Sequence, residues 1–209
     1  MLLSTFWIGL TGGLSGGISS TIAGGNFWDG FRQGIITSGL NHVAHQIGGP
    51  SEKRQEIVRK AKSHNGSTDW ELDGRNGRYG AGVHKCNIFV DDVLGEAGIY
   101  TPDPNGMSAS LGLGSPVTAG QWADPNYNVP GWKIVSSPQA GDVVAYGTSH
   151  YSDATGHTGI MISSKLSIGA STTGVVRVTD FGSNPSHLPS DAHYVYRRYV
   201  GFPQLILHL

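Results

Sequence analysis

Residues 85–98 read KCNIFVDDVLGEAG, and their apolar side chains recur at steps of three and four residues. This spacing is typical of a helix with one buried face. That face carries Cys86, Phe89, Val90, Val93, Leu94 and Ala97. Asp91 and Asp92 fall on the opposite face, and Gly98 is a typical helix stop. The stretch therefore predicts an amphipathic helix with Cys86 in its first turn.

The rest of the domain predicts strands. Residues 100–131 are rich in Gly, Pro and Asn, which indicates a long loop. Four later segments combine period-two alternation with short connections, which favours an antiparallel sheet. They are residues 142–146, 157–163, 175–180 and 193–200. One helix followed by a run of strands indicates an α+β fold, with the Cys-bearing helix packed on a small antiparallel sheet.

The amino-terminal part has a different composition. Residues 1–49 are rich in Gly, Ser and Thr, so we expect a leader separate from a domain over residues 50–209. The composition fits a flexible leader and a packed one equally well. The first residues lack Lys and Arg, and glycines break the apolar run after Leu10, which makes a poor signal peptide and no stable membrane anchor. A short surface helix is expected over residues 51–64, with Ser51 as its N-cap.

Composition excludes several functions. The chain of 209 residues has a net charge of −1, which argues against a nucleic-acid partner. A single cysteine excludes an internal disulfide and a Cys-rich zinc site. His150, Asp153 and His157 lack the spacing of metal ligands, so we expect no metal and no cofactor.

Cys86 is the candidate nucleophile. The unpaired N–H groups and the dipole at a helix start stabilise a thiolate, and Lys85 adds a neighbouring positive charge. We therefore predict a thiol that is accessible and partly ionised near neutral pH. The alternative is a small apolar side chain that fills the core.

His157 is the candidate base. It opens the strand segment GHTGIMI over residues 156–162, where its ring can project from the end of the sheet and from there reach a thiol on a helix packed across that face. His84 and His150 are the competing histidines. His84 lies two residues before Cys86 and is expected to point away from the thiol.

Asp180 is the candidate residue that orients His157, because an imidazole base needs a polar partner on its second nitrogen. If Ser163 pairs with Gly174 in a hairpin, residue 180 lies opposite residue 157. The alternative is a turn aspartate before Phe181. Ser171 and Asn184 are the fallback candidates for the same role.

Three motifs, taken in order, carry a resemblance. Cys-x-x-Phe-Val begins at Cys86, Pro-x-x-Gly-Asp spans residues 138–142, and Gly-His-x-Gly-Ile spans residues 156–160. Over residues 79–200 this order resembles the NlpC-type and CHAP-type families of papain-like cell-wall hydrolases. The resemblance implies a papain-like core and hydrolysis of amide bonds in the peptidoglycan stem peptide by Cys86 and His157. Many family members carry Ser or Asp close to the cysteine, whereas Val83-His84-Lys85 precede it here.

The leader has its own resemblance. Residues 12–45 look like the Gly-rich segment that precedes the toxin domain in Rhs-type (YD-repeat) polymorphic toxins. This implies the carboxy-terminal toxin end of a larger secreted protein or type VI secretion effector, delivered to the periplasm of a target cell. It also implies a cognate immunity protein as a partner.

Two alternatives remain at this point. The same Cys/His pair would serve a cysteine deamidase, protease or acyltransferase that acts on a protein or lipid substrate. A non-enzymatic secreted binding module, with Cys86 as core filler, would tolerate Cys86→Ala and resist alkylation.

Overall fold

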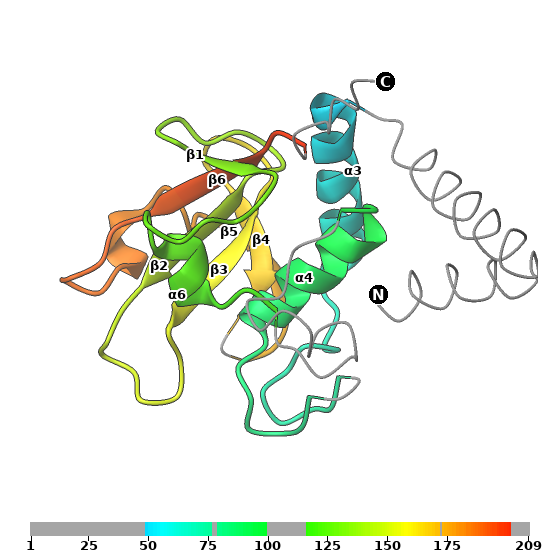
Figure 1. The fold of residues 1–209 in the computed structure, drawn as a ribbon. Coiled ribbons are helices and arrows are strands. Elements are labelled where there is room, and N and C mark those ends of the chain that lie inside the picture. The colour runs from blue at the N-terminus through cyan, green and yellow to red at the C-terminus, as the bar shows by residue number, and fades with distance from the viewer. Residues whose placement is uncertain (1–48, 77–78, 100–115, 172, 202–209) are drawn as a thin grey trace, which may run out of the picture. The chain divides into compact units, whose positions relative to one another are not determined.

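The computed structural model describes residues 49–76, 79–99, 116–171 and 173–201, which all belong to one compact unit (Figure 1). Its helices are α3 (Pro50–Ser63), α4 (Cys86–Glu96) and α6 (Ala119–Ala123), with a 3₁₀ turn, η1 (Pro185–His187). Its strands are β1 (Trp132–Val135), β2 (Val143–Gly147), β3 (Gly156–Met161), β4 (Ser167–Ala170), β5 (Val176–Thr179) and β6 (Val195–Tyr199). The described residues therefore form an α+β fold, as predicted. Residues 1–48 of the expected leader and residues 100–115 of the expected loop lie outside the described residues.

The six strands form one antiparallel sheet in the order β1-β6-β2-β3-β4-β5. The four predicted strands correspond to β2, β3, β5 and β6. β1 and β4, which have only four residues each, were not predicted from the sequence. A segment of that length shows little alternation, and the Ser and Gly residues of β4 are typical of a turn.

The position of β4 overturns the expected hairpin between the third and fifth strands. Ile160 of β3 pairs with Ile168 of β4, and Ile168 pairs in turn with Val178 of β5. Because β4 separates β3 from β5, the predicted pairing of Ser163 with Gly174 is wrong. Asp180 consequently does not lie opposite His157.

The predicted Cys-bearing helix is confirmed as α4, which begins at Cys86 and packs on β3 and β4 (Figure 1). Its predicted apolar residues are all buried. Gly98 follows with a φ of +68°, a left-handed conformation that suits glycine. Burial of a full apolar face fixes the helix and therefore the position of Cys86.

Two further helices flank α4. α3 begins at Pro50 after Gly49, so the predicted N-cap at Ser51 is wrong by two residues. Proline suits the first helical position because its φ is fixed near the helical value. α6 lies inside the predicted loop, and Thr118 and Gln121 cap it reciprocally. A helix of five residues is too short for a periodic signal.

The two faces of the sheet carry different layers. Helices α3, α4 and α6 contribute to one apolar core with alternate sheet residues such as Ala145, Ile160 and Ile168. On the other face, Val144, Tyr146 and Met161 pack with Phe181 from the segment after β5. Because side chains alternate along a strand, each strand residue is committed to one of these layers.

The Pro-x-x-Gly-Asp motif has a structural role at the start of β2. Gly141 has a φ of +87°, and the fully buried carboxylate of Asp142 accepts a hydrogen bond from the Gln139 N–H at 2.7 Å. The guanidinium of Arg198 donates to both Asp142 oxygens, at 2.9 and 2.7 Å. This bidentate pair ties β6 to the turn that begins β2.

Candidate functional site

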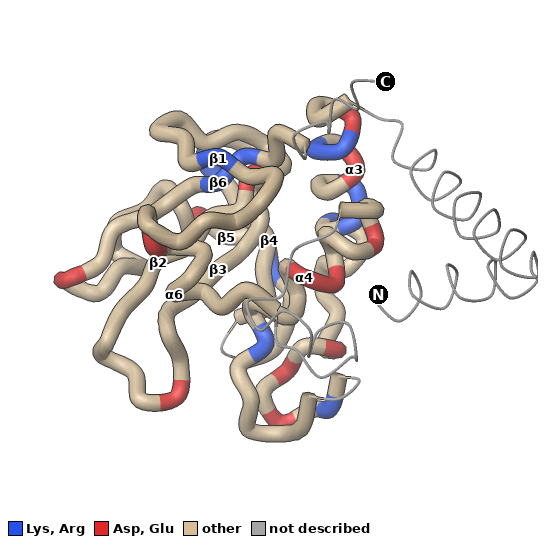
Figure 2. Tube along the Cα trace, in the orientation of Figure 1, with Lys and Arg blue, Asp and Glu red and all other residues tan. Residues whose placement is uncertain are grey.

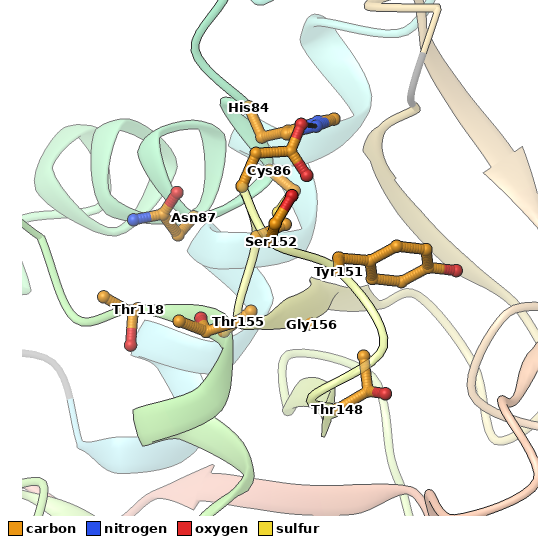
Figure 3. Close-up of a pocket in the computed structure, with 12 residues that line it drawn as sticks. His84, Cys86, Asn87, Thr118, Thr148, Tyr151, Ser152, Thr155 and Gly156 are labelled. Carbon is orange, nitrogen blue, oxygen red and sulfur yellow. Dashed lines mark hydrogen bonds and ion pairs between the residues drawn. The ribbon is translucent and has the colours of Figure 1, made fainter.

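Cys86 borders a cavity of about 450 Å³ (Figure 3). The walls come from the start of α4, from Thr118 and Ala119, and from the loop over residues 148–156. Figure 3 shows Cys86 beside His84, with Tyr151 and Ser152 on the loop side. The nucleophile candidate therefore lies where a ligand has room to approach it.

The Cys86 thiol is buried. The residue is 8 % exposed, and burial raises the pKa of the thiol although backbone hydrogen bonds from Thr158 and Asn87 act to lower it. Burial thus opposes the predicted partly ionised thiol, although the residue lines the cavity. Helix-start amides do favour the thiolate, but the loss of water around the sulfur outweighs them.

Lys85 does not supply the charge that we expected at the thiol. Its ammonium group donates hydrogen bonds to the backbone oxygens of Glu71, Leu72 and Val83, at 2.8, 3.2 and 3.1 Å. Burial lowers the pKa of Lys85. The side chain thus anchors the segment before α4 rather than a thiolate.

Alkylation of Cys86 is expected to be slower at pH 7 than that of free cysteine, and to accelerate as the pH rises past 9. The reason is that only the thiolate reacts, and burial shifts its formation above the ordinary pKa of about 8.5. Iodoacetamide rates between pH 6 and 10, with free cysteine alongside, measure this. A rate already maximal at pH 7 would contradict the buried, neutral thiol.

His157 lies on the sheet face that is turned away from α4. Its neighbours Thr158 and Ile160 are buried toward the helices, so alternation along β3 directs the His157 ring to the other layer. There its ring lies 4.7 Å from that of Phe181, and Tyr146 is its cross-strand partner. The expectation that the ring projects from the face covered by the helix is therefore wrong.

Cys86 nevertheless contacts β3 at the residue next to His157. The sulfur of Cys86 accepts a backbone hydrogen bond from Thr158, the residue that follows His157. Burial, followed by the charges of His84 and His187, lowers the pKa of His157 to about 4. In the described ranges, no hydrogen bond or ion pair joins the two side chains directly. At neutral pH both groups are uncharged.

Asp180 pairs with His187 rather than with His157. Its carboxylate pairs with His187 Nε2 at 2.6 Å and accepts from Asn184 Nδ2 at 2.8 Å. The hydrogen bond from His187 is the main cause that lowers the pKa of Asp180. The structure therefore separates Asp180 from the role predicted for it, because β4 takes the place beside β3.

The two fallback residues also have other partners. The observed register of β3 and β4, continued past its last pair, would place Ser171 opposite His157. The hydroxyl of Ser171 shares a 2.8 Å hydrogen bond with that of Thr173. Asn184 accepts the Ser186 N–H at 2.9 Å.

His84 lines the same cavity as Cys86, contrary to the expectation that it points away (Figure 3). Its Nε2 lies 3.2 Å from Asp153 Oδ2, and Asp153 also lines the cavity. His84 precedes the first residue of α4, so helical geometry does not dictate its direction. The competing histidine His150 pairs with Asp191 at 3.0 Å.

Two tyrosines were not singled out from the sequence. Burial and contacts with Tyr151 raise the pKa of Tyr146 to about 12, and the charge of Cys86 is a further cause. Tyr146 therefore lies within electrostatic range of the sulfur and close to Tyr151. From the sequence, a tyrosine in an apolar strand is expected to be a core residue. Only the structure shows that Tyr146 lies near the Cys86 sulfur.

Gly156 determines how the cavity loop returns to the sheet. It has a φ of +141°, and a Cβ there would lie 1.9 Å from the backbone oxygen of Tyr146. Only glycine permits this close approach. The residue thereby fixes the start of β3, where His157 follows.

No group of three or more His, Cys, Asp or Glu side chains within the described ranges is placed to hold a metal ion. Among those same residues, no helix has both the length and the apolar character needed to cross a membrane. Comparison with protein-family models, curated proteins and solved structures found no significant match to this chain.

Proposed function

We propose that this chain is a papain-like cysteine hydrolase that cleaves amide bonds in the stem peptide of peptidoglycan. One observation carries the proposal. Cys86 is the first residue of α4 and borders a cavity, and its sulfur contacts the backbone of Thr158, the residue after His157 on β3. The order of the three motifs supplies the substrate class by resemblance.

The proposed chemistry begins with both groups neutral. For this step the His157 ring must reach the sulfur around the start of β3, where Thr158 contacts Cys86. His157 then accepts the thiol proton as the sulfur of Cys86 attacks the amide carbonyl carbon, which breaks the carbonyl π bond and leaves an oxyanion. Backbone N–H groups at the start of α4 are suitable donors to that oxyanion. The imidazolium then gives its proton to the departing amine, and water hydrolyses the thioester to release the acid and restore the thiol.

A low pKa suits His157 as a base in one respect. Its ring is unprotonated over the physiological range, so no proton must leave before it can accept one from the thiol. The cost is a weaker base for the thiol proton, which stabilisation of the oxyanion would have to offset.

We further propose that the protein is a secreted antibacterial toxin, delivered to the periplasm of a target cell and inhibited by a cognate immunity protein. The support is the resemblance of residues 12–45 to the segment before Rhs-type toxin domains. A cysteine deamidase, protease or acyltransferase would use the same Cys/His pair and is the competing enzymatic function.

Purified protein is expected to release soluble peptide fragments from peptidoglycan sacculi, and Cys86→Ala is expected to lower that release at least about a thousandfold, because the nucleophile is lost. Mass analysis of the fragments identifies the amide bond that is cut. Cys86→Ala should retain the circular dichroism spectrum of the wild type.

Equal release by wild type and Cys86→Ala would contradict a cysteine mechanism. If the wild-type protein left sacculi intact but deamidated, cleaved or acylated a protein or lipid, the competing function would replace the proposal.

A further inference from the structure

A second cavity adjoins the one that Cys86 borders. It has a volume of about 430 Å³ and is lined by His150, Tyr151 and residues 186–190. Tyr151 lines both cavities. A single extended ligand that enters the Cys86 cavity can therefore continue past Tyr151 into the second one.

The walls of the second cavity combine polar groups without any cation from Lys or Arg. Ser186 and Ser190 offer hydroxyl groups, and His150 and His187 offer imidazoles. Figure 2 shows Lys and Arg on α3 and around β1 and β6. The loop 148–155 and the segment 184–193 contain neither residue. This chemistry favours an uncharged ligand with many hydroxyl or amide groups over an anion.

A carboxylate lies beside each imidazole. His150 Nε2 lies 3.0 Å from Asp191 Oδ1, and His187 Nε2 lies 2.6 Å from Asp180 Oδ1. Each pair uses Nε2 and leaves Nδ1 for another partner. The His187 ring is held by a hydrogen bond and is therefore a preorganised group, which lowers the entropic cost of binding.

Tyr151 supplies an aromatic surface between the two cavities. It is 49 % exposed and lies close to Tyr146. Leu188 and Pro189 add apolar wall to the second cavity. An exposed ring beside hydroxyl and imidazole groups suits a ligand with both an apolar face and a polar edge.

We propose that the second cavity binds a sugar unit of the glycan strand, so that the preferred substrate is a stem peptide still attached to its glycan. A pyranose ring has the required apolar face and hydroxyl edge and carries no charge. The inference about the substrate rests on the proposed function, whereas binding of a sugar in this cavity does not.

Binding can be measured without any hydrolysis. A soluble trimer of N-acetylglucosamine, titrated into the wild-type protein by calorimetry or NMR, is expected to bind. Ser190→Trp, which fills the cavity, and Tyr151→Ala, which removes the ring, should each weaken binding at least tenfold. Ser136→Trp places the same side chain on an exposed residue outside both cavities and should bind like wild type.

A kinetic experiment compares two substrates, the stem peptide attached to its glycan and the same peptide without the glycan. Ser190→Trp should raise KM at least fivefold more for the attached substrate than for the free one, and Ser136→Trp should change neither. No binding of the trimer, or equal binding by wild type and Ser190→Trp, overturns the inference. So does a variant that raises KM equally for both substrates, since the cavity would then hold peptide. Failure of sacculus hydrolysis with intact sugar binding would instead count against the proposed function.

Discussion

Arg198→Ala is expected to lower the free energy of unfolding by about 3–5 kcal/mol, because it leaves the Asp142 carboxylate buried without its charge partner. The Asp142 side chain is completely buried, and the Arg198 guanidinium contacts both of its oxygens. Arg198 also donates to the backbone oxygen of Ser137 at 2.8 Å. For a protein of this size the melting temperature should fall on the order of 10 °C.

Urea and thermal unfolding followed by circular dichroism measure the loss. Lys133→Ala is the matched control, because Lys133 is exposed on β1 in the position that pairs with Arg198. Its removal should change stability by no more than about 0.5 kcal/mol. A similar decrease in the free energy of unfolding in both variants would show that the Asp142–Arg198 pair stabilises the protein no more than an exposed side chain does.

His157→Ala is expected to lower kcat/KM on sacculi by about 10²- to 10⁴-fold, the usual contribution of a positioned general base. The residue lies directly before Thr158, whose backbone contacts the Cys86 sulfur. His193→Ala is a suitable control, because His193 is exposed and lines neither of the two cavities described above. Near-wild-type turnover in His157→Ala would transfer the role to His84, which shares the cavity with Cys86.

The pH profile tests the same assignment without mutation. Because the pKa of His157 is lowered to about 4, the base stays unprotonated as the pH falls from 7 to 5, and activity should be lost only as the pH passes through about 4. An acid limb near 6.5, the ordinary value for histidine, would point to a solvated imidazole instead.

The helix with Cys86 could be predicted because a single apolar face runs through all of its turns. A strand is instead predicted from alternation of apolar and polar residues. That pattern was too weak for β4, whose four residues contain Ser167 and Gly169. That one omission changed the predicted partner of β3 and with it the argument for Asp180. Strand order depends on contacts between distant segments, which local alternation does not encode.

The positions of the candidate site residues were predictable in part for a similar reason. Cys86 and His157 stand at the starts of a helix and a strand, where local patterns are informative. The cavity, however, depends on the loop 148–156, and its contact of His84 with Asp153 joins residues without a shared local pattern. The direction of the His157 ring followed from the buried side of Thr158 and Ile160, which only the packed sheet reveals.

The three backbone contacts of Lys85 make this residue a chemical reporter of local opening. While its ammonium group is bound to the oxygens of Glu71, Leu72 and Val83, an amine-acylating reagent has no access to a free lone pair on it. Acylation therefore requires the segment before α4 to detach, and its rate measures how often that detachment occurs. Since Cys86 is the next residue, peptide mapping of acylated Lys85 would record the opening motions of the chain directly beside the thiol.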